Sequence, residues 1–198
     1  MKITFKLVKN IVDIFPVELR DHSYNVCSLS LKLAEYLGYK KERLHNLAIG
    51  SILHDIGKTR INEKILNKPG SLTEEEFAIV KNHTVIGAEL LKSFKDFEGI
   101  LPAILYHHER WDGAGYEGLK ENDIPEIAQI VTIADAFDAM TTNRPYQKTK
   151  TLIETLHELN NNKALQFSPV LVERFERCII DDSKKASSRL HPNSPFSS

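Results

Sequence analysis

Histidine and carboxylate side chains that could bind a metal ion recur along the chain, near expected helix ends and inside apolar segments. Five of the eight histidines have this setting, namely His22, His54, His83, His107 and His108. Asp55 follows one of them directly, Asp135 interrupts the apolar stretch IAQIVTIADAF, and Glu18 precedes His22 by four residues. Carried by several helices, these imidazole and carboxylate groups can converge in the core of a bundle.

The donor types in this set are those of an open catalytic metal centre. Nitrogen and oxygen donors without a thiolate argue against a closed structural zinc site, and they suit Fe, Mn, Ni, Co or Zn. Asp55 offers two oxygens and could bridge two ions. Two ions roughly 3.5 to 4 Å apart would share a water, lower its pKa and clamp a phosphoryl group for in-line attack.

Each of these residues has a simpler interpretation when it is taken alone. A single histidine on an apolar face is more often a core residue than a ligand. A buried carboxylate such as Asp135 can be neutralised by a salt bridge or can serve as a cap. The number of such residues favours the metal centre, because buried charges are costly without compensation. His45, His157 and His191 lack this context, and we expect them at the surface or in the tail.

The elements that must position these groups are helices. Apolar residues recur at helical spacing, a capping box is expected at Thr73–Glu76, and the glycine-rich stretch WDGAGYEG predicts a loop. The expected helices span about 20–37, 41–56, 73–90 and 97–109, followed by a long apolar helix from Pro125 and two more, the last opening at residue 168. Without an alternating strand pattern, the sequence predicts an all-α fold, a single helical bundle with an additional C-terminal helical region.

Composition and charge limit the class of protein. With 198 residues and 41% hydrophobic composition, we expect one domain over residues 1–180 and a disordered Ser- and Pro-rich tail over 181–198. Lys and Arg (26) nearly balance Asp and Glu (27), so no overall positive field is available to hold a nucleic-acid polymer. The interrupted apolar residues at the N-terminus predict neither a membrane span nor a signal peptide. Cys27 and Cys178 have no partner at metal-binding spacing, and a reduced cytoplasm is the expected location.

The order of these histidines and aspartates, with the pair His54-Asp55 in LHDIGK, resembles the HD superfamily of metal-dependent phosphohydrolases. HHERWDGAGY at 107–116, IADAFDAMTT at 133–142 and RPY at 144–146 look like the signature segments of its HD-GYP branch, and the resemblance covers roughly residues 21–175. It implies an HD fold and two or three divalent metal ions, Fe or Mn before Zn, Ni or Co. It also implies hydrolysis of the bacterial messenger cyclic di-GMP to pGpG and/or GMP through a metal-bridging hydroxide.

Matched motif by motif, the resemblance implies a role for each site residue. The metal ligands would be Glu18, His22, His54, Asp55, His83, His107, His108 and Asp135. Asp55 would bridge the ions, and Lys58 would contact the scissile phosphate and assist the leaving oxygen. Arg144 resembles a phosphate-binding arginine, and Lys148 stands beside Gln147, a position that is often basic in the family. Tyr116 would orient its loop or stack on a base.

Three of these roles keep an alternative interpretation. Glu/His pairs at i and i+4 are common on helices, so the ligand role of Glu18 is conditional. Lys58 alone would be typical of a helix C-terminus, where the dipole favours a cation. A loop tyrosine such as Tyr116 is commonly a packing residue.

The chain departs from the family in the loop that names the branch. The usual Gly-Tyr-Pro-x-Gly-Leu reads Gly-Tyr-Glu-Gly-Leu at 115–119, one residue shorter and without proline. Loss of proline is expected to loosen the loop, and Glu117 adds a negative charge where a dianionic substrate would approach. Two alternatives therefore stay open: a phosphohydrolase for another cyclic dinucleotide or nucleotide, and a non-catalytic module that binds cyclic di-GMP or a partner protein.

The expected partners follow from the same resemblance. Members of this branch are often fused to a sensory domain, whereas fewer than twenty residues precede the first expected ligand helix. We therefore expect cyclic di-GMP as the small-molecule partner and a sensory or diguanylate-cyclase-type protein as a candidate protein partner.

Overall fold

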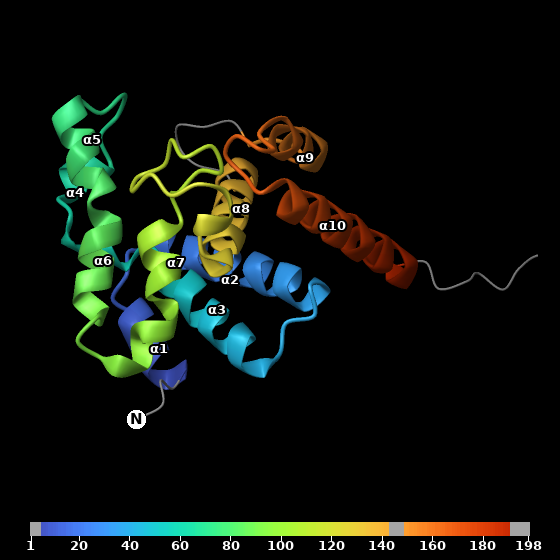
Figure 1. Ribbon diagram of the computed structural model, residues 1–198, viewed down its shortest axis with the longest axis horizontal. Coiled ribbons are helices and arrows are strands. Elements are labelled where there is room, and N and C mark those ends of the chain that lie inside the picture. Colours follow the sequence, from blue (N-terminus) through green and yellow to red (C-terminus); the bar gives the residue numbers. More distant parts are fainter. Residues whose placement is uncertain (1–4, 143–148, 191–198) are drawn as a thin grey trace, which may run out of the picture.

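The fold is built from helices that pack on one another at several angles (Figure 1). The computed structural model describes residues 5–142 and 149–190, with side chains described from residue 6 to residue 185 within these ranges. Its α-helices are α1 (Phe5–Val12), α2 (Val17–Tyr36), α3 (Lys41–Leu53), α4 (Glu63–Leu66), α5 (Glu74–Lys81), α6 (His83–Leu91), α7 (Leu101–Tyr106), α8 (Glu126–Thr141), α9 (Leu152–Asn161) and α10 (Pro169–Leu190). The 3-10 helices are η1 (Ile56–Arg60), η2 (Lys95–Ile100) and η3 (Glu121–Asp123). No strand occurs in the two described ranges, and the predicted all-α fold is confirmed.

Two apolar clusters form the core, and α3 contributes to both. Leu47 of α3 packs with residues of α2, α8, α9 and α10, including the fully buried Phe175. Ile49 and Leu53, on another side of α3, pack with residues of α1, α7 and η2. Apolar residues on more than one side of a helix are typical of an element buried between layers. The C-terminal end of α3, where His54 and Asp55 follow, is thereby held inside the molecule.

Several helices end earlier than the sequence predicts. The helix expected over 41–56 ends at Leu53, with His54 as its C-cap, and the next residues form η1. The helix expected over 73–90 is divided at Asn82 into α5 and α6, and the predicted capping box at its start is confirmed. The segment expected as one helix over 97–109 is η2 followed by α7, which begins at Leu101 with Pro102 in its first turn, where the missing N–H costs no helical hydrogen bond.

The two ends of the chain differ most from expectation. The N-terminal segment, for which no helix is predicted, forms α1 and buries Val8 and Val12 in the second cluster. Helix α10 continues to Leu190, ten residues into the segment 181–198 that is expected to be a disordered tail, and the domain boundary after residue 180 stays a prediction. Extending a helix beyond the turns anchored by the buried Phe175 costs little, since nucleation is already complete. Residues 191–198 lie outside the described residues, so the tail there stays a prediction.

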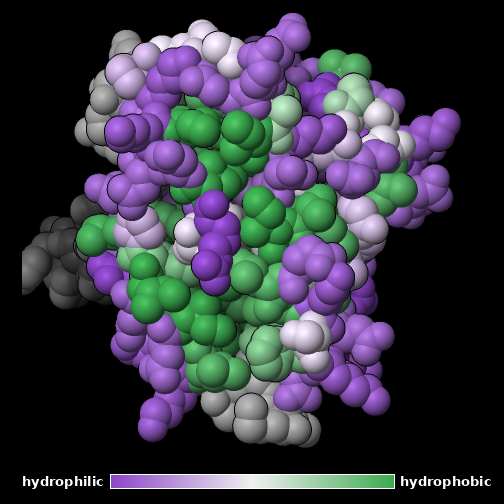
Figure 2. Space-filling view, turned by 90° about the vertical axis from the view of Figure 1, so that its left-hand side faces the viewer, coloured by the Kyte–Doolittle hydropathy of each residue, from purple (hydrophilic) through white to green (hydrophobic). Residues whose placement is uncertain are grey.

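Helix α6 is apolar on nearly all sides. Its sequence HTVIGAELL buries Ala88 and Leu91, while Val85 is exposed. Figure 2 shows apolar side chains gathered in a broad band on the side of the molecule where α5 and α6 lie in Figure 1. Within the described ranges, no helix combines the length and apolarity needed to span a bilayer.

Candidate metal centre

The ends of several helices meet where the predicted ligands lie. His54 caps α3, Asp55 precedes η1, and His83 is the first residue of α6. His22 comes from the middle of α2, and the remaining ligands follow α7 or lie within α8, namely His107, His108 and Asp135. Packing of α2 on α3 and α8, and of α6 on η1 and α7, brings these segments together.

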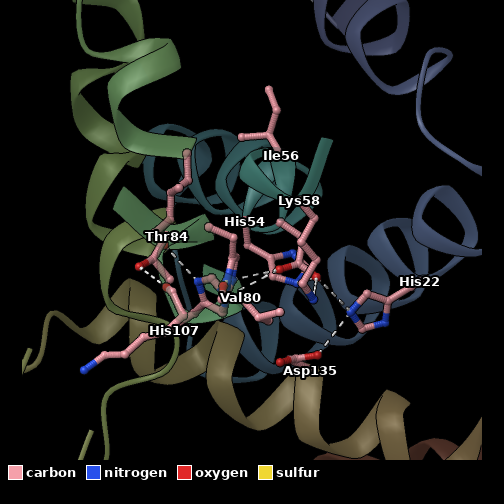
Figure 3. A network of polar contacts seen from close by, with 12 residues as sticks. His22, His54, Ile56, Lys58, Val80, Thr84, His107 and Asp135 are labelled. Carbon is pink, nitrogen blue, oxygen red and sulfur yellow. Dashed lines mark hydrogen bonds and ion pairs between the residues drawn. The ribbon is translucent and has the colours of Figure 1, made fainter. Parts of the chain in front are cut away.

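Seven of the eight predicted ligands form two adjacent groups. One group consists of Asp55, His83, His107 and His108, and the other of His22, His54 and Asp135. In each group the candidate ligand atoms all lie within 4.8 Å of one another. Figure 3 shows the side chains of His22 and Asp135 directed toward His54, which lies near the centre of the cluster.

The carboxylate of Asp55 stands between the two groups. Its Oδ1 lies 3.2 Å from His83 Nε2 and 3.7 Å from His107 Nε2. Its Oδ2 lies 3.3 Å from His54 Nε2 and 3.8 Å from His22 Nε2. One oxygen therefore faces each group, which is the arrangement that a bridging carboxylate requires.

Hydrogen bonds at Nδ1 orient four histidines so that each presents Nε2 to the site. His54 Nδ1 lies 2.7 Å from the Ser51 carbonyl oxygen, and His83 Nδ1 lies 2.7 Å from that of Val80. A carbonyl oxygen only accepts, so Nδ1 carries the proton and Nε2 keeps its lone pair. The same holds for His107, whose Nδ1 bonds the carbonyl oxygens of Ala103 and Ile104. His22 also directs Nδ1 to Asp138, but its Nε2 lies 3.1 Å from Asp135 Oδ1 and carries a proton in the metal-free protein, which a metal ion would displace. Such partners of the other ring nitrogen are usual behind metal-bound histidines.

The buried lone pairs at the centre fit a cation. His54 Nε2 and Asp55 Oδ1 are buried, and no hydrogen-bond donor among the described residues reaches either atom. The Nε2 atoms of His83 and His107 face each other at 3.3 Å, with both protons directed away from the contact. Acceptors that face acceptors in a buried place are costly unless a positive charge lies between them. The donor set thus fits divalent metal ions.

Burial and neighbouring charges set the protonation of the site. Burial lowers the pKa of His107 to about 4, although the neighbouring Asp55 acts to raise it. Burial and the nearby His107 lower the pKa of His108. Burial opposes ionisation of Asp55, but Lys58 and His54 outweigh it and hold the pKa of this carboxyl well below its usual range. At neutral pH these groups are therefore neutral imidazoles and a carboxylate, the forms that bind metal.

Asp138 is a residue of the site that the sequence analysis does not single out. It is 3% exposed, and its carboxylate accepts hydrogen bonds from His22 Nδ1 at 2.6 Å, Asn25 Nδ2 at 2.9 Å and Thr142 Oγ1 at 2.8 Å. Burial alone would lower the pKa of His22, but its bonds to Asp135 and Asp138 raise this pKa to about 9. The available signal was the spacing of Asp135 and Asp138, which are one helical turn apart and share a face.

The other predicted site residues lie at different distances from the two groups. Lys58 Nζ is 2.6 Å from Asp55 Oδ2. The ring of Tyr116 lies against His108, with centroids 4.7 Å apart. Glu18 is exposed in the first turn of α2 and belongs to neither group. Arg144 and Lys148 lie outside the described residues.

Comparison with known proteins points to one family. The HD domain family matches residues 6–171. The chain is 40% identical over 193 residues to a cyclic di-GMP phosphodiesterase of Thermotoga maritima, an alignment that covers 90% of this chain and 52% of that protein. It is 34% identical over 174 residues to the 3'3'-cGAMP-specific phosphodiesterase 2 of Vibrio cholerae, covering 85% of this chain and 33% of that protein. The chain thus spans about half the length, or less, of these curated relatives.

Among solved structures, the chain resembles Bd1817, a HDG"Y"P protein from Bdellovibrio bacteriovorus. The TM-score is 0.68 at 24% sequence identity, and the match covers 89% of this chain and 58% of that one. This likeness shows a shared all-helical fold.

Proposed function

The chain belongs to the HD domain family, in its HD-GYP branch, and on this premise we propose that it is a metal-dependent phosphodiesterase that hydrolyses cyclic di-GMP to pGpG and/or GMP. The bond cleaved is a phosphodiester, and the nucleophile is a water molecule. Support comes from relatives that are named phosphodiesterases of cyclic dinucleotides and from the donor set around Asp55.

The position of Asp55 is the observation that carries the proposal. It is 1% exposed, and each of its two oxygens faces a different group of histidine nitrogens. A carboxylate that only stabilised the fold would have hydrogen-bond donors at both oxygens, whereas within 5–142 and 149–190 no donor reaches Oδ1. Two groups of donors that share one carboxylate fit a pair of ions. Mixed nitrogen and oxygen ligands suit several first-row ions, and we propose Fe or Mn before Zn, Ni or Co on the family resemblance.

The residues of the site would have different roles: some hold the metal ions, and others contact the phosphate. The four histidines with fixed Nδ1 protons hold Nε2 at set positions, which lowers the cost of organising the centre. Divalent ions bound there would supply an activated water and neutralise charge on the phosphate. Lys58, 28% exposed and paired with Asp55, is placed to contact a phosphate oxygen as well. We propose Arg144 and Lys148 as further phosphate contacts, and Glu18 as a ligand only if a third ion is bound.

A second candidate substrate is a mixed cyclic dinucleotide. Relatives of this chain include proteins named as specific for 3'3'-cGAMP, and the loop at 115–119 differs from the usual sequence of the branch. Both substrates present the same phosphodiester linkage, so the metal centre would serve either. Discrimination would then lie in contacts with the bases.

We further propose that this chemistry takes place in the cytoplasm. Cys27 and Cys178 are free thiols, as is usual in a reducing compartment. A sensory or diguanylate-cyclase-type protein stays the proposed protein partner, in keeping with relatives that are longer than this chain.

The test is hydrolysis by metal-reconstituted protein. Protein purified without oxygen would be loaded separately with Fe(II), Mn(II), Ni(II) or Zn(II) and given cyclic di-GMP or 3'3'-cGAMP, with products separated by chromatography. We expect turnover with at least one ion, and loss of turnover in Asp55→Ala with the helical circular dichroism retained. Asp181→Ala, which removes an exposed aspartate of α10, serves as the matched control. Binding of a dinucleotide without cleavage under every metal would refute the enzyme and favour a binding module.

A further inference from the structure

The carboxylate of Glu109 is buried and bound to the backbone of a loop. Glu109 follows His107 and His108 in sequence and is 2% exposed. It accepts a hydrogen bond from the backbone N–H of Glu117 at 2.6 Å through Oε1, and another from the N–H of Leu119 at 2.6 Å through Oε2. A buried carboxylate needs such donors, and two bonds to one short segment fix the position of that segment.

The backbone of this loop lies directly on the backbone of Glu109. A Cβ added at Gly115 would lie 2.6 Å from Glu109 Cα and 2.7 Å from Arg110 N, so only glycine fits there. Gly118 has a φ of +81°, a conformation that L side chains rarely adopt. Between these two glycines stand Tyr116 and Glu117. The path of the loop is therefore set by Glu109 and by the two glycines together.

The same loop places an aromatic ring at the metal centre. The ring of Tyr116 packs against that of His108 with centroids 4.7 Å apart and meets His83 at 6.4 Å. Tyr116 has two further neighbours, both on α5. The ring of Phe77 lies 6.3 Å away between centroids, and Lys81 Nζ lies 5.1 Å from the centroid of the Tyr116 ring. Tyr116 therefore lies between two candidate ligands and a cation of α5.

The departure from the usual loop sequence changes these bonds. Proline has no backbone N–H and could not donate to Glu109 at position 117. Glu117 supplies that donor, so the loss of proline is compensated by a hydrogen bond. This hydrogen bond acts against the expected loosening of the loop, which stays a prediction. Glu117 itself directs its side chain to solvent.

We propose that Glu109 is a positioning residue, which holds the segment 115–119 through the amides of Glu117 and Leu119 so that Tyr116 is fixed against His108 for contact with a base of the substrate. The effect that this role of Glu109 would have on kinetics rests on the proposed function. The hydrogen bonds from Glu109 to the two amides can be measured without any substrate.

Amide hydrogen exchange of Glu109→Gln tests the structural part. Glutamine retains one acceptor oxygen and presents an NH₂ group to the other amide, so at least one bond is lost. We expect the amides of Glu117 and Leu119 to exchange about 10- to 100-fold faster, while those of α3 and α8 keep their protection. Glu117→Gln removes a carboxylate of the same size but keeps its N–H, and should leave both amides protected. Fast exchange of both amides in the unaltered protein, or equal exchange in Glu109→Gln, would overturn the proposal.

Glu109→Asp provides a second variant if Glu109→Gln fails to fold. It keeps the charge but shortens the side chain by one methylene, so the carboxylate no longer reaches both amides, and the amides of Glu117 and Leu119 should exchange faster than in the unaltered protein. Unchanged exchange at both amides would overturn the proposal.

Kinetics distinguish a positioning role from a general effect on stability. With the active metal form, Glu109→Gln should raise KM about 10-fold with a smaller change in kcat, because metal content is unchanged and base contact is weakened. In a Tyr116→Ala background the same substitution should have little further effect, since Glu109 acts through Tyr116. Additive effects would refute that route. If no form of the protein shows turnover, while Glu109→Gln still speeds hydrogen exchange of the amides of Glu117 and Leu119, the proposed function is refuted. The role of Glu109 in holding the loop would still stand.

Discussion

The stability of the metal-free protein should decrease as pH rises from about 6.5 to 9. In the folded chain the pKa of His22 is raised from 6.5 to about 9, because bonds to Asp135 and Asp138 outweigh burial. Folded protein therefore holds one more proton than unfolded protein in this interval, and its free energy of unfolding falls as that proton is lost. The stabilisation is complete below the unfolded pKa and absent above the folded one.

The size of the effect follows from the shift. The rise of the His22 pKa from 6.5 to about 9, at about 1.4 kcal/mol per pKa unit, corresponds to about 3 to 4 kcal/mol. His22 is 11% exposed, so screening by water removes little of this value. The lowered pKa values of His107 and His108 affect stability only below about 6.5, because both the folded and unfolded forms are neutral above it. The raised pKa values of Cys27 and Cys178 matter only above about 9.

Urea unfolding of chelator-treated protein measures this directly. The free energy of unfolding would be determined by circular dichroism at half-unit steps from pH 6.5 to 9, for the unaltered protein and for His22→Gln. In His22→Gln the free energy of unfolding should not decrease with pH over this interval. Equal slopes in both proteins, or no slope in either, would refute the assignment of the proton to His22 between the two aspartates.

Metal binding should have the opposite pH dependence to the stability of the metal-free protein. A metal ion at the group of His22, His54 and Asp135 must displace the proton of His22, so its apparent affinity rises with pH by up to about tenfold per unit below pH 9. The gain in stability on adding Mn(II) should therefore increase over the interval in which the metal-free protein loses stability. A gain independent of pH would show that bound metal leaves His22 protonated.

Three substitutions test other parts of the structure. Asp138→Asn should weaken Mn(II) binding about 10- to 100-fold in a titration of metal-free protein, because it changes the hydrogen-bond partner of His22 Nδ1. An unaltered affinity would show that Asp138 does not support metal binding by His22. Gly57→Ala should destabilise the protein by about 3 kcal/mol or more in urea unfolding, since the added Cβ would lie 1.9 Å from the His83 carbonyl oxygen. Thr73→Ala should cost about 1 kcal/mol by loss of the capping box and leave Mn(II) affinity unchanged, so a combined loss would contradict the separation of the two regions.

Local patterns in the sequence determined much of the fold. Helical periodicity predicts the all-α class, and the capping box at Thr73 and the position of His54 at a helix end are confirmed. These features depend on residues within one or two turns, where spacing and side-chain chemistry decide the outcome. Helix ends were less predictable. The break at Asn82 depends on packing against other elements, whereas α10 continues to Leu190 through residues whose described side chains, at 181–185, are exposed.

The residue types of the site were also readable from the sequence, because histidine and aspartate inside apolar segments are costly and therefore informative. Their arrangement was not. His22 and Asp138 are 116 positions apart and meet only because α2 packs on α8. The two oxygens of Asp55 face different groups, and Glu18 stays exposed although its spacing from His22 is suitable.

The loop shows the same division most clearly. The sequence determined that position 117 lacks proline and that glycines flank it. Only the tertiary structure decided that the free N–H of Glu117 meets the buried carboxylate of Glu109, eight residues earlier in the chain. Helical spacing and capping are short-range rules, whereas such a contact depends on the path of an irregular segment, which the packing of its neighbours sets.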